Sequence, residues 1–200
     1  MPTGAGKSVL FMLPAWVEPG GVSIVVVPLK GLREDMVHWC EQLGIRCAVW
    51  DGRQQPDGAS IVLATSEKAM QDAFGTYISR MKQTQRSDRI VIDECHVILN
   101  DQLDFRKRMQ QLGKLAHAEV QMVLLTATMP PSKDAMLYER MYWRQEEVAM
   151  IRAPTVRKNI RYSIHDGGGS AQEHDATLQR IVQAGLTNAP QAHSKVLVVC

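Results

Sequence analysis

The sequence predicts an α/β fold in which helices cover both faces of a mostly parallel β-sheet. Two observations lead to this prediction. Short apolar runs rich in β-branched residues alternate along the chain with longer stretches of helical periodicity. The apolar runs are continuous, as is typical of strands that are buried on both faces. Hydrophobic residues make up 45% of the 200 positions, which is enough for an ordinary buried core.

Each element follows from its own stretch of sequence. A helix is expected directly after the glycine-rich segment at the start of the chain, from about Val9 onward. Turn and polar residues bound four continuous apolar runs, which we predict as strands at residues 22–27, 60–63, 89–92 and 121–125. Helices are predicted between them at residues 31–43, 67–83 and 105–117.

The alternating pattern stops near Pro154, and residues 159–164 then read as an extended segment. A helix at residues 172–185 and a strand at residues 195–200 are expected after it. We therefore predict a first domain at residues 1–152, a linker at residues 153–170 and the start of a second, incomplete α/β domain at residues 171–200.

Charge and cysteine content narrow the class of protein. The formal net charge of +2 is too balanced to establish a nucleic-acid partner. The four cysteines have neither zinc-ligand spacing nor the pattern of a disulfide scaffold. We therefore expect no zinc and a reducing compartment, the nucleus or the cytoplasm. No apolar run reaches the roughly 18 residues needed to cross a bilayer, so no membrane partner is expected.

The first eight residues are typical of a loop that binds phosphate. Consecutive backbone N–H groups of such a loop can surround phosphate oxygens, while Lys7 reaches the β- and γ-phosphates and the Ser8 hydroxyl binds Mg²⁺. The candidate nucleotide-binding residues are Thr3, Gly4, Ala5, Gly6, Lys7 and Ser8.

A phosphate-binding loop normally joins the end of a strand to a helix, and here the loop begins at residue 1. We therefore expect the first strand of the sheet to be missing and the chain to be a piece of a longer protein. Loss of a central strand would leave backbone groups of its neighbours unpaired, at about 1–3 kcal/mol each. Because a domain is stable by only about 5–15 kcal/mol, we expect this piece to fold poorly alone.

Two carboxylates follow the strand predicted at residues 89–92. Asp93 can hold the same Mg²⁺ as Ser8, and Glu94 can orient an attacking water molecule. With Lys7, these carboxylates are the candidate catalytic residues of nucleoside-triphosphate hydrolysis. A glycine-rich loop or an acidic strand end is unremarkable by itself, but here they occur in the order that this chemistry needs.

With the loop, the Asp93-Glu94-Cys95-His96 box and the segment Thr126-Ala127-Thr128 in this order, the chain resembles superfamily 2 helicases of the DExH-box type. It is most similar to the RecQ-like DNA helicases, and the similarity includes residues 27–35, 64–68, 157–162 and 195–200. The resemblance implies two RecA-like domains, ATP and Mg²⁺ as cofactors, and DNA as partner, at single strands or duplex junctions. It also implies unwinding in the 3′ to 5′ direction.

The resemblance further implies roles for single residues. His96 joins the catalytic residues and links the γ-phosphate site to Thr126 and Thr128, which would couple hydrolysis to movement. The candidate nucleic-acid-binding residues are Pro28, Lys30, Thr65, Ser66 and Arg106. The remainder of the second motor domain would supply an arginine to the transition state, so we expect this piece alone to hydrolyse ATP slowly or not at all.

The sequence departs from the family pattern in three places. The upstream adenine-reading segment is absent, Ser66 replaces a proline, and the aromatic-rich loop after the box is reduced to residues 104–106. Two alternatives stay open. One is an RNA-directed superfamily 2 helicase, which shares the core motifs. The other is a non-catalytic, truncated remnant that binds nucleotide weakly or does not fold alone.

Overall fold

The structure is a computed structural model, and it describes residues 6–17, 20–53, 56–99, 112–153 and 170–187. The chain divides into two compact units, Met1–Val156 and Arg157–Cys200. None of the described helices is both long enough and apolar enough to span a membrane.

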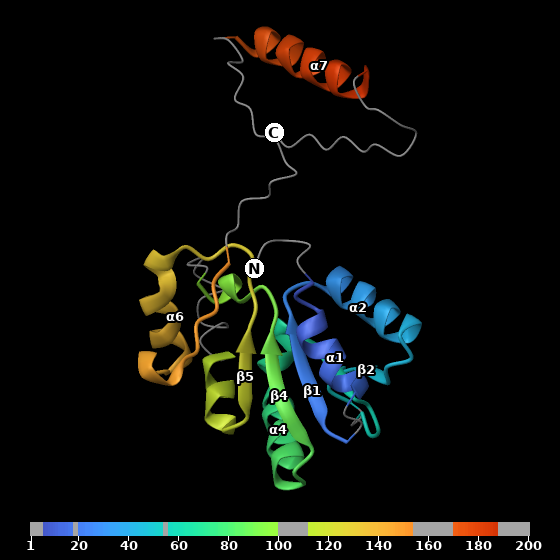
Figure 1. The fold of residues 1–200 in the computed structure, drawn as a ribbon, viewed down its shortest axis with the longest axis vertical. Helices are drawn as coiled ribbons and strands as arrows, with labels where there is room; N and C mark the ends of the chain where they lie inside the picture. Colours follow the sequence, from blue (N-terminus) through green and yellow to red (C-terminus); the bar gives the residue numbers. More distant parts are fainter. Residues whose placement is uncertain (1–5, 18–19, 54–55, 100–111, 154–169, 188–200) are drawn as a thin grey trace. The chain divides into compact units, whose positions relative to one another are not determined.

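The described part of the first unit contains a five-stranded parallel sheet with the strand order β2-β3-β1-β4-β5 (Figure 1). The strands are β1 (Val22–Val27), β2 (Cys47–Val49), β3 (Ile61–Thr65), β4 (Ser87–Ile92) and β5 (Gln121–Leu124). The predicted α/β class with a parallel sheet is confirmed. The sequence-based prediction of a further strand before residue 1 concerns residues outside this chain and stays a prediction.

The sheet is buried on both faces because its two central strands are apolar at nearly every position. All residues of β1 and β3 are buried. Alternate side chains point to opposite faces of a sheet, so neighbours in β1 join different cores. Val25 packs with Leu63 and Val91 on one face, whereas Ile24 packs with Ile90 on the other.

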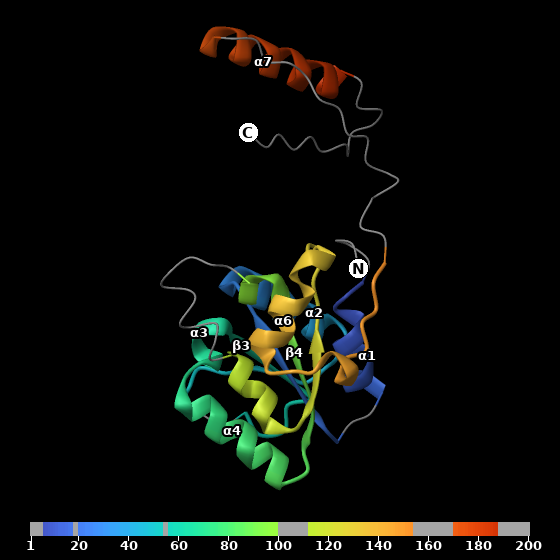
Figure 2. The ribbon, with the colours of Figure 1, turned by 90° about the vertical axis from the view of Figure 1, so that its left-hand side faces the viewer.

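Different helices cover the two faces (Figure 2). Helix α1 (Val9–Val17) and helix α2 (Lys30–Gln42) cover one face, where they contribute Phe11 and Met36. Helix α4 (Asp72–Gln83) covers the other face with Phe74. These helices agree with the predictions for residues 9 onward and 31–43, and they leave the carboxyl ends of the parallel strands uncovered for a site.

The helix predicted at residues 67–83 is wrong as a single element, because the structure has two helices there. Helix α3 (Ser66–Ala69) ends before α4 begins, and Gln71 between them is extended, with φ −79° and ψ 142°. Its carbonyl accepts the N–H of Phe74 at 2.9 Å. Neither proline nor glycine marks this break, so the periodicity of the sequence runs across it.

The region after β4 also differs from the prediction. Of the helix predicted at residues 105–117, residues 105–111 lie outside the described part, and the rest contains the short 3₁₀ turn η2 (Lys114–Ala118). Helix α6 (Asp134–Met141) was not predicted. Further 3₁₀ turns are η1 (Cys95–Leu99), η3 (Pro131–Lys133) and η4 (Gln145–Glu147).

Gly113 sets how closely the turn η2 can approach α6. A Cβ atom at this position would lie 2.2 Å from the carbonyl oxygen of Arg140, which is backbone and cannot rotate away. Glycine is therefore required by close packing rather than by its φ angle. Arg140 also donates a hydrogen bond to the carbonyl of Ile98, so α6 is held against the segment that follows the Asp-Glu pair.

The described part of the second unit is helix α7 (Ala171–Thr187), close to the predicted range 172–185. Ser170 precedes it and forms a reciprocal cap with Glu173: the Ser170 N–H donates to Glu173 Oε2 at 3.0 Å, and the Glu173 N–H donates to Ser170 Oγ at 3.3 Å. The extended segment at 159–164 and the strand at 195–200 lie outside the described residues.

Candidate nucleotide-binding site

The candidate phosphate loop turns directly into helix α1. Gly6 has φ +74°, a left-handed conformation that favours glycine. The carbonyls of Gly6 and Ser8 accept the N–H groups of Val9 and Met12, both at 3.0 Å. Lys7 and Ser8 thus lie at the helix N-terminus, where the backbone favours an anion. Thr3, Gly4 and Ala5 lie outside the described residues.

Asp93 and Glu94 begin the turn that follows β4, and the neighbouring strands hold this turn at both ends. The N–H of Asp93 donates to the carbonyl of Val26 at 2.9 Å, and the N–H of Cys95 donates to the carbonyl of Leu125 at 2.8 Å. The turn is therefore fixed by the ends of β1 and β5, which places both carboxylates at the carboxyl edge of the sheet.

Asp93 is one of the few buried charged residues in the described core, with 8% of its surface exposed. Burial raises the pKa of its carboxyl group, which is opposed by a hydrogen bond from the Glu94 N–H at 3.0 Å and by the charge of Lys7. A buried carboxylate with one backbone donor has further oxygen lone pairs available to a cation.

Glu94 adopts a left-handed backbone conformation with φ 50°. A residue other than glycine is disfavoured there by about 1–2 kcal/mol, and such strain concentrates at functional sites. The conformation turns the Glu94 side chain toward the phosphate loop, so that its Oε1 lies 3.9 Å from Nζ of Lys7. Two motifs that are distant in the sequence thus meet in space.

His96 joins the other carboxylate oxygen of Glu94 to the segment after β5. Its Nδ1 lies 3.1 Å from Glu94 Oε2 and 3.2 Å from the hydroxyl oxygens of both Thr126 and Thr128. The N–H of Thr128 donates to the Thr126 hydroxyl at 3.1 Å. The two threonines therefore form one compact turn around a single imidazole nitrogen, which we call the threonine turn.

The donor set fits Mg²⁺ bound together with a triphosphate. Mg²⁺ prefers hard oxygen ligands and is commonly held by one or two carboxylates plus substrate phosphates, which matches the Asp93 carboxylate and the Ser8 hydroxyl beside a phosphate loop. Among the described residues, no cluster of three or more His, Cys, Asp and Glu side chains forms a metal site independent of substrate.

The candidate DNA-binding residues lie on two adjacent strand ends. Pro28 and Lys30 follow β1, Thr65 ends β3, and Val27 and Thr65 are partners in the sheet register. The Ser66 hydroxyl donates to the carbonyl of Val27 at 3.4 Å. Thr65 and Ser66 are buried, whereas Lys30 is exposed, so Lys30 is the accessible charged group here. Arg106 lies outside the described residues.

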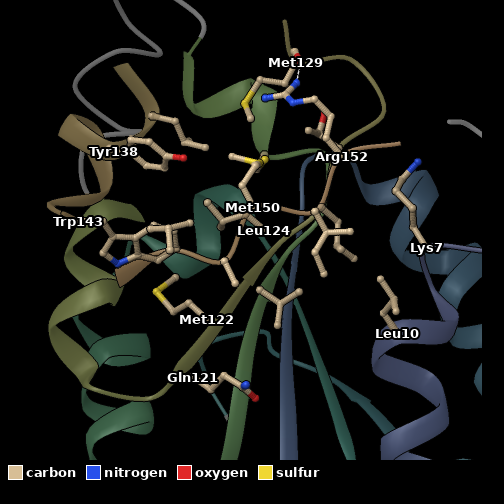
Figure 3. Close-up of a pocket in the computed structure, with 18 of the residues that line it drawn as sticks. Lys7, Leu10, Gln121, Met122, Leu124, Met129, Tyr138, Trp143, Met150 and Arg152 are labelled. Atoms are coloured by element: carbon tan, nitrogen blue, oxygen red, sulfur yellow. Dashed lines mark hydrogen bonds between the residues drawn. The ribbon is translucent and has the colours of Figure 1, made fainter. Parts of the chain in front are cut away.

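A mostly apolar cavity of about 770 Å³ lies along β5 (Figure 3). Lys7, which precedes α1, and Leu10 of α1 line one side, and Trp143 lines the opposite side. Met122 and Leu124 of β5 lie between them. Lys7 is the lining residue that this cavity shares with the candidate phosphate site, whereas Asp93 and Glu94 do not line it.

No motif in the sequence singles out Arg152. Its guanidinium donates to the carbonyl of Met129 at 2.7 Å (Figure 3) and to both carboxylate oxygens of Asp134 at 2.7 and 2.8 Å. These partners are far from Arg152 in the sequence and belong to no motif. An isolated arginine near the end of an α/β pattern is ordinarily a solvated residue, so only the fold reveals this contact.

Comparison with known proteins agrees with these features. The sequence model of DEAD/DEAH box helicases matches residues 1–136. ATP-dependent DNA helicase Q5 of Rattus norvegicus is 29% identical over 182 residues, and RecQ-like DNA helicase blm-1 of Caenorhabditis elegans is 31% identical over 186 residues. Both alignments cover 82% of this chain and 18% of the relative.

A bacterial relative is similar over more of this chain. The probable ATP-dependent DNA helicase RecS of Bacillus subtilis is 27% identical over 195 residues, which cover 90% of this chain and 38% of that protein. The chain thus spans only about a fifth to two fifths of these relatives. The predicted resemblance to RecQ-type helicases is confirmed, and the chain belongs to the DEAD/DEAH box helicase family.

Proposed function

We propose that this chain is the ATP-binding part of a RecQ-type DNA helicase, in which hydrolysis of Mg-ATP drives the separation of DNA strands. The observation that carries the proposal is the meeting of the phosphate loop with the carboxylate turn, at 3.9 Å between Lys7 and Glu94. The unwinding direction that we propose, 3′ to 5′, and the location in the nucleus or cytoplasm follow from the resemblance to this class of helicase.

The residues divide the work by their chemistry. The phosphate loop with Lys7 binds the triphosphate, and Ser8 and Asp93 hold the metal ion. A Mg²⁺ ion held by these two residues would supply positive charge to offset the negative charge that develops on the phosphate oxygens. Glu94 orients the water molecule that attacks the γ-phosphate, as a positioned carboxylate can.

The threonine turn offers a route from hydrolysis to movement. Nδ1 of His96 lies 3.1 Å from Glu94 Oε2 and also contacts Thr126 and Thr128. A change at Glu94 on loss of the γ-phosphate would therefore alter the position of the imidazole and of the threonine turn. We propose that the complete second motor domain supplies the transition-state arginine.

DNA is the proposed partner, bound through the ends of β1 and β3 near Pro28 and Lys30. Backbone groups and a lysine at strand ends suit contacts to phosphates, which position a strand without reading its sequence. Fluorescence anisotropy with a labelled single-stranded DNA tests this role. Lys30→Ala should weaken binding, and competition by RNA of the same length that equals competition by DNA would favour an RNA-directed helicase instead.

Thermal unfolding tests nucleotide binding by the 200-residue chain. A ligand at about 100 times its Kd stabilises the native state by about 2.7 kcal/mol, which corresponds to several degrees for a domain of this size. Mg-ATP should raise the Tm of the wild-type chain and of the Lys30→Ala control but not that of Lys7→Ala. A cooperative wild-type transition that Mg-ATP leaves unchanged would overturn the proposal.

A further inference from the structure

Arg152 connects two segments of the first unit, and none of the proposed steps of ATP hydrolysis uses this connection. It lies in the stretch that follows η4, shortly before the first unit ends at Val156. One nitrogen of its guanidinium, Nη1, donates to the carbonyl of Met129, and the other, Nη2, donates to both oxygens of Asp134. Three hydrogen bonds of 2.7–2.8 Å therefore converge on one side chain.

The partners of Arg152 are the two ends of one short connection. Met129 ends the segment that follows β5, and Asp134 begins helix α6. Between them, the N–H of Lys133 donates to the carbonyl of Pro130 at 3.0 Å, and η3 begins at Pro131. Because Arg152 binds both ends at once, it holds the connection in a single geometry.

Arginine suits this position better than lysine. The guanidinium is planar and presents several N–H groups in fixed directions, so it can bind a carboxylate and a carbonyl together, whereas an ammonium acts as a point charge. The pair is also partly shielded, because 37% of the Arg152 side chain and 25% of the Asp134 side chain are exposed. Such a pair is less screened than an ordinary surface pair.

The connection leads directly to the threonine turn. Met129 is the residue after Thr128, so the bond from Arg152 to its carbonyl fixes the peptide plane that directly follows the threonine turn. Thr128 in turn donates its N–H to Thr126 and places its hydroxyl 3.2 Å from Nδ1 of His96. Arg152 thus lies at the far end of a chain of contacts that begins at Glu94.

We propose that Arg152 is a positioning residue that fixes the threonine turn against His96 and ties this turn to residues 148–153. The inference rests on the proposed function for the role of His96 in hydrolysis. It extends that function by naming a residue that holds the threonine turn in place.

Nuclear magnetic resonance of the isotope-labelled 200-residue chain tests the inference without nucleotide. Arg152→Ala should shift the His96 imidazole signals and the Thr126 and Thr128 amide signals away from their wild-type positions. Arg144→Ala is the matched control, because Arg144 also pairs with a carboxylate, Glu147 at 2.5 Å, but is 80% exposed. This control should leave the three sets of signals unchanged.

Arg152→Lys keeps the test decisive if the alanine variant does not fold, because it retains a positive charge beside Asp134. The lysine should still shift the His96 and threonine signals, since it cannot hold both partners. Unchanged signals in a folded Arg152 variant would overturn the inference. A wild-type chain whose signals do not respond to Mg-ADP would overturn the proposed function instead, while the nucleotide-free comparison would still decide the role of Arg152.

Discussion

Nδ1 of His96 lies 3.1 Å from a carboxylate oxygen of Glu94 and 3.2 Å from the Thr128 hydroxyl. One imidazole nitrogen therefore contacts both Glu94, which is proposed to orient water, and the threonine turn, which is proposed to couple ATP hydrolysis to movement. A histidine in this place can bind either partner more tightly as the charge around Glu94 changes. We propose that His96 is the link between ATP hydrolysis and movement.

Replacing Thr128 with valine should separate ATP binding from its coupling to DNA. Valine keeps the shape but removes the hydroxyl that contacts His96, while the phosphate loop stays intact. In a protein that contains both motor domains, the stimulation of ATPase activity by DNA should fall by about 5- to 150-fold, the usual range of coupling free energies. The Kd for Mg-ATP should stay within about threefold. Unchanged stimulation would contradict the coupling role.

The Glu94→Gly variant should be more stable than the Glu94→Ala variant. Both variants lack the carboxylate, but only glycine adopts φ 50° without steric strain. The free energy of unfolding of Glu94→Gly should therefore exceed that of Glu94→Ala by about 1 kcal/mol. Chemical denaturation of the two variants measures the difference. Equal stability would mean that the left-handed conformation of Glu94 stores no strain.

Ionisation of the buried Asp93 carboxyl group should lower the free energy of unfolding as the pH rises. Because burial raises the pKa of Asp93 in the folded chain above its ordinary value near 3.8, the unfolded chain loses this proton first. The destabilisation is absent at pH values below the ordinary pKa of aspartate and grows as the pH rises from there. It is complete at pH values above the raised pKa of Asp93 in the folded chain. Asp93→Asn should therefore raise the Tm at pH 7 in the absence of nucleotide.

The control for this prediction is the same comparison at acidic pH, near the ordinary pKa of aspartate, where the two Tm values should approach each other. Mg²⁺ with nucleotide should also narrow the difference at pH 7, because a bound cation favours the ionised carboxylate. A lower Tm of Asp93→Asn at pH 7 without nucleotide would show that hydrogen bonding to Asp93 outweighs its burial.

Two glycines should respond in opposite directions to replacement with alanine. Gly113→Ala should destabilise the fold, because the added Cβ would lie 2.2 Å from the Arg140 carbonyl oxygen, and overpacking of this kind costs about 1–3 kcal/mol. Gly75→Ala should stabilise it by about 0.5–1 kcal/mol, since Gly75 lies inside α4 with open space around it. Thermal unfolding of both variants shows directly whether each substitution raises or lowers the Tm.

The sequence predicted the parts of the fold in which one local pattern decides the structure. Strand β1 is continuously apolar over Val22–Val27 apart from Ser23, so its burial on both faces could be read directly. Strand β2 has only three residues, Cys47–Val49, too few for a pattern. The sequence predicts one helix where the structure has α3 and α4, because Gln71, which separates them, is not a residue type that breaks helices.

The same distinction holds for the candidate site. The sequence predicted that the phosphate loop and the carboxylates serve one Mg²⁺ ion, but the approach of Lys7 to Glu94 is visible only in the structure. The contact of Arg152 with Met129 and Asp134 was not expected, since it depends on where α6 packs after the threonine turn. Periodicity predicts which face of an element is buried, but it does not predict which distant polar groups that packing brings together.

The measurement that tests the central claim most directly is calorimetric titration of Mg-ATP into the 200-residue chain and two variants. If the phosphate loop and the carboxylate turn form one site with separate roles, Lys7→Ala should raise the Kd at least about tenfold, because it removes a charged hydrogen bond worth about 1.5–3 kcal/mol. Glu94→Gln should keep the Kd within about threefold, because Glu94 acts on water rather than on phosphate. Equal affinity of Lys7→Ala and the wild-type chain for Mg-ATP would contradict the account.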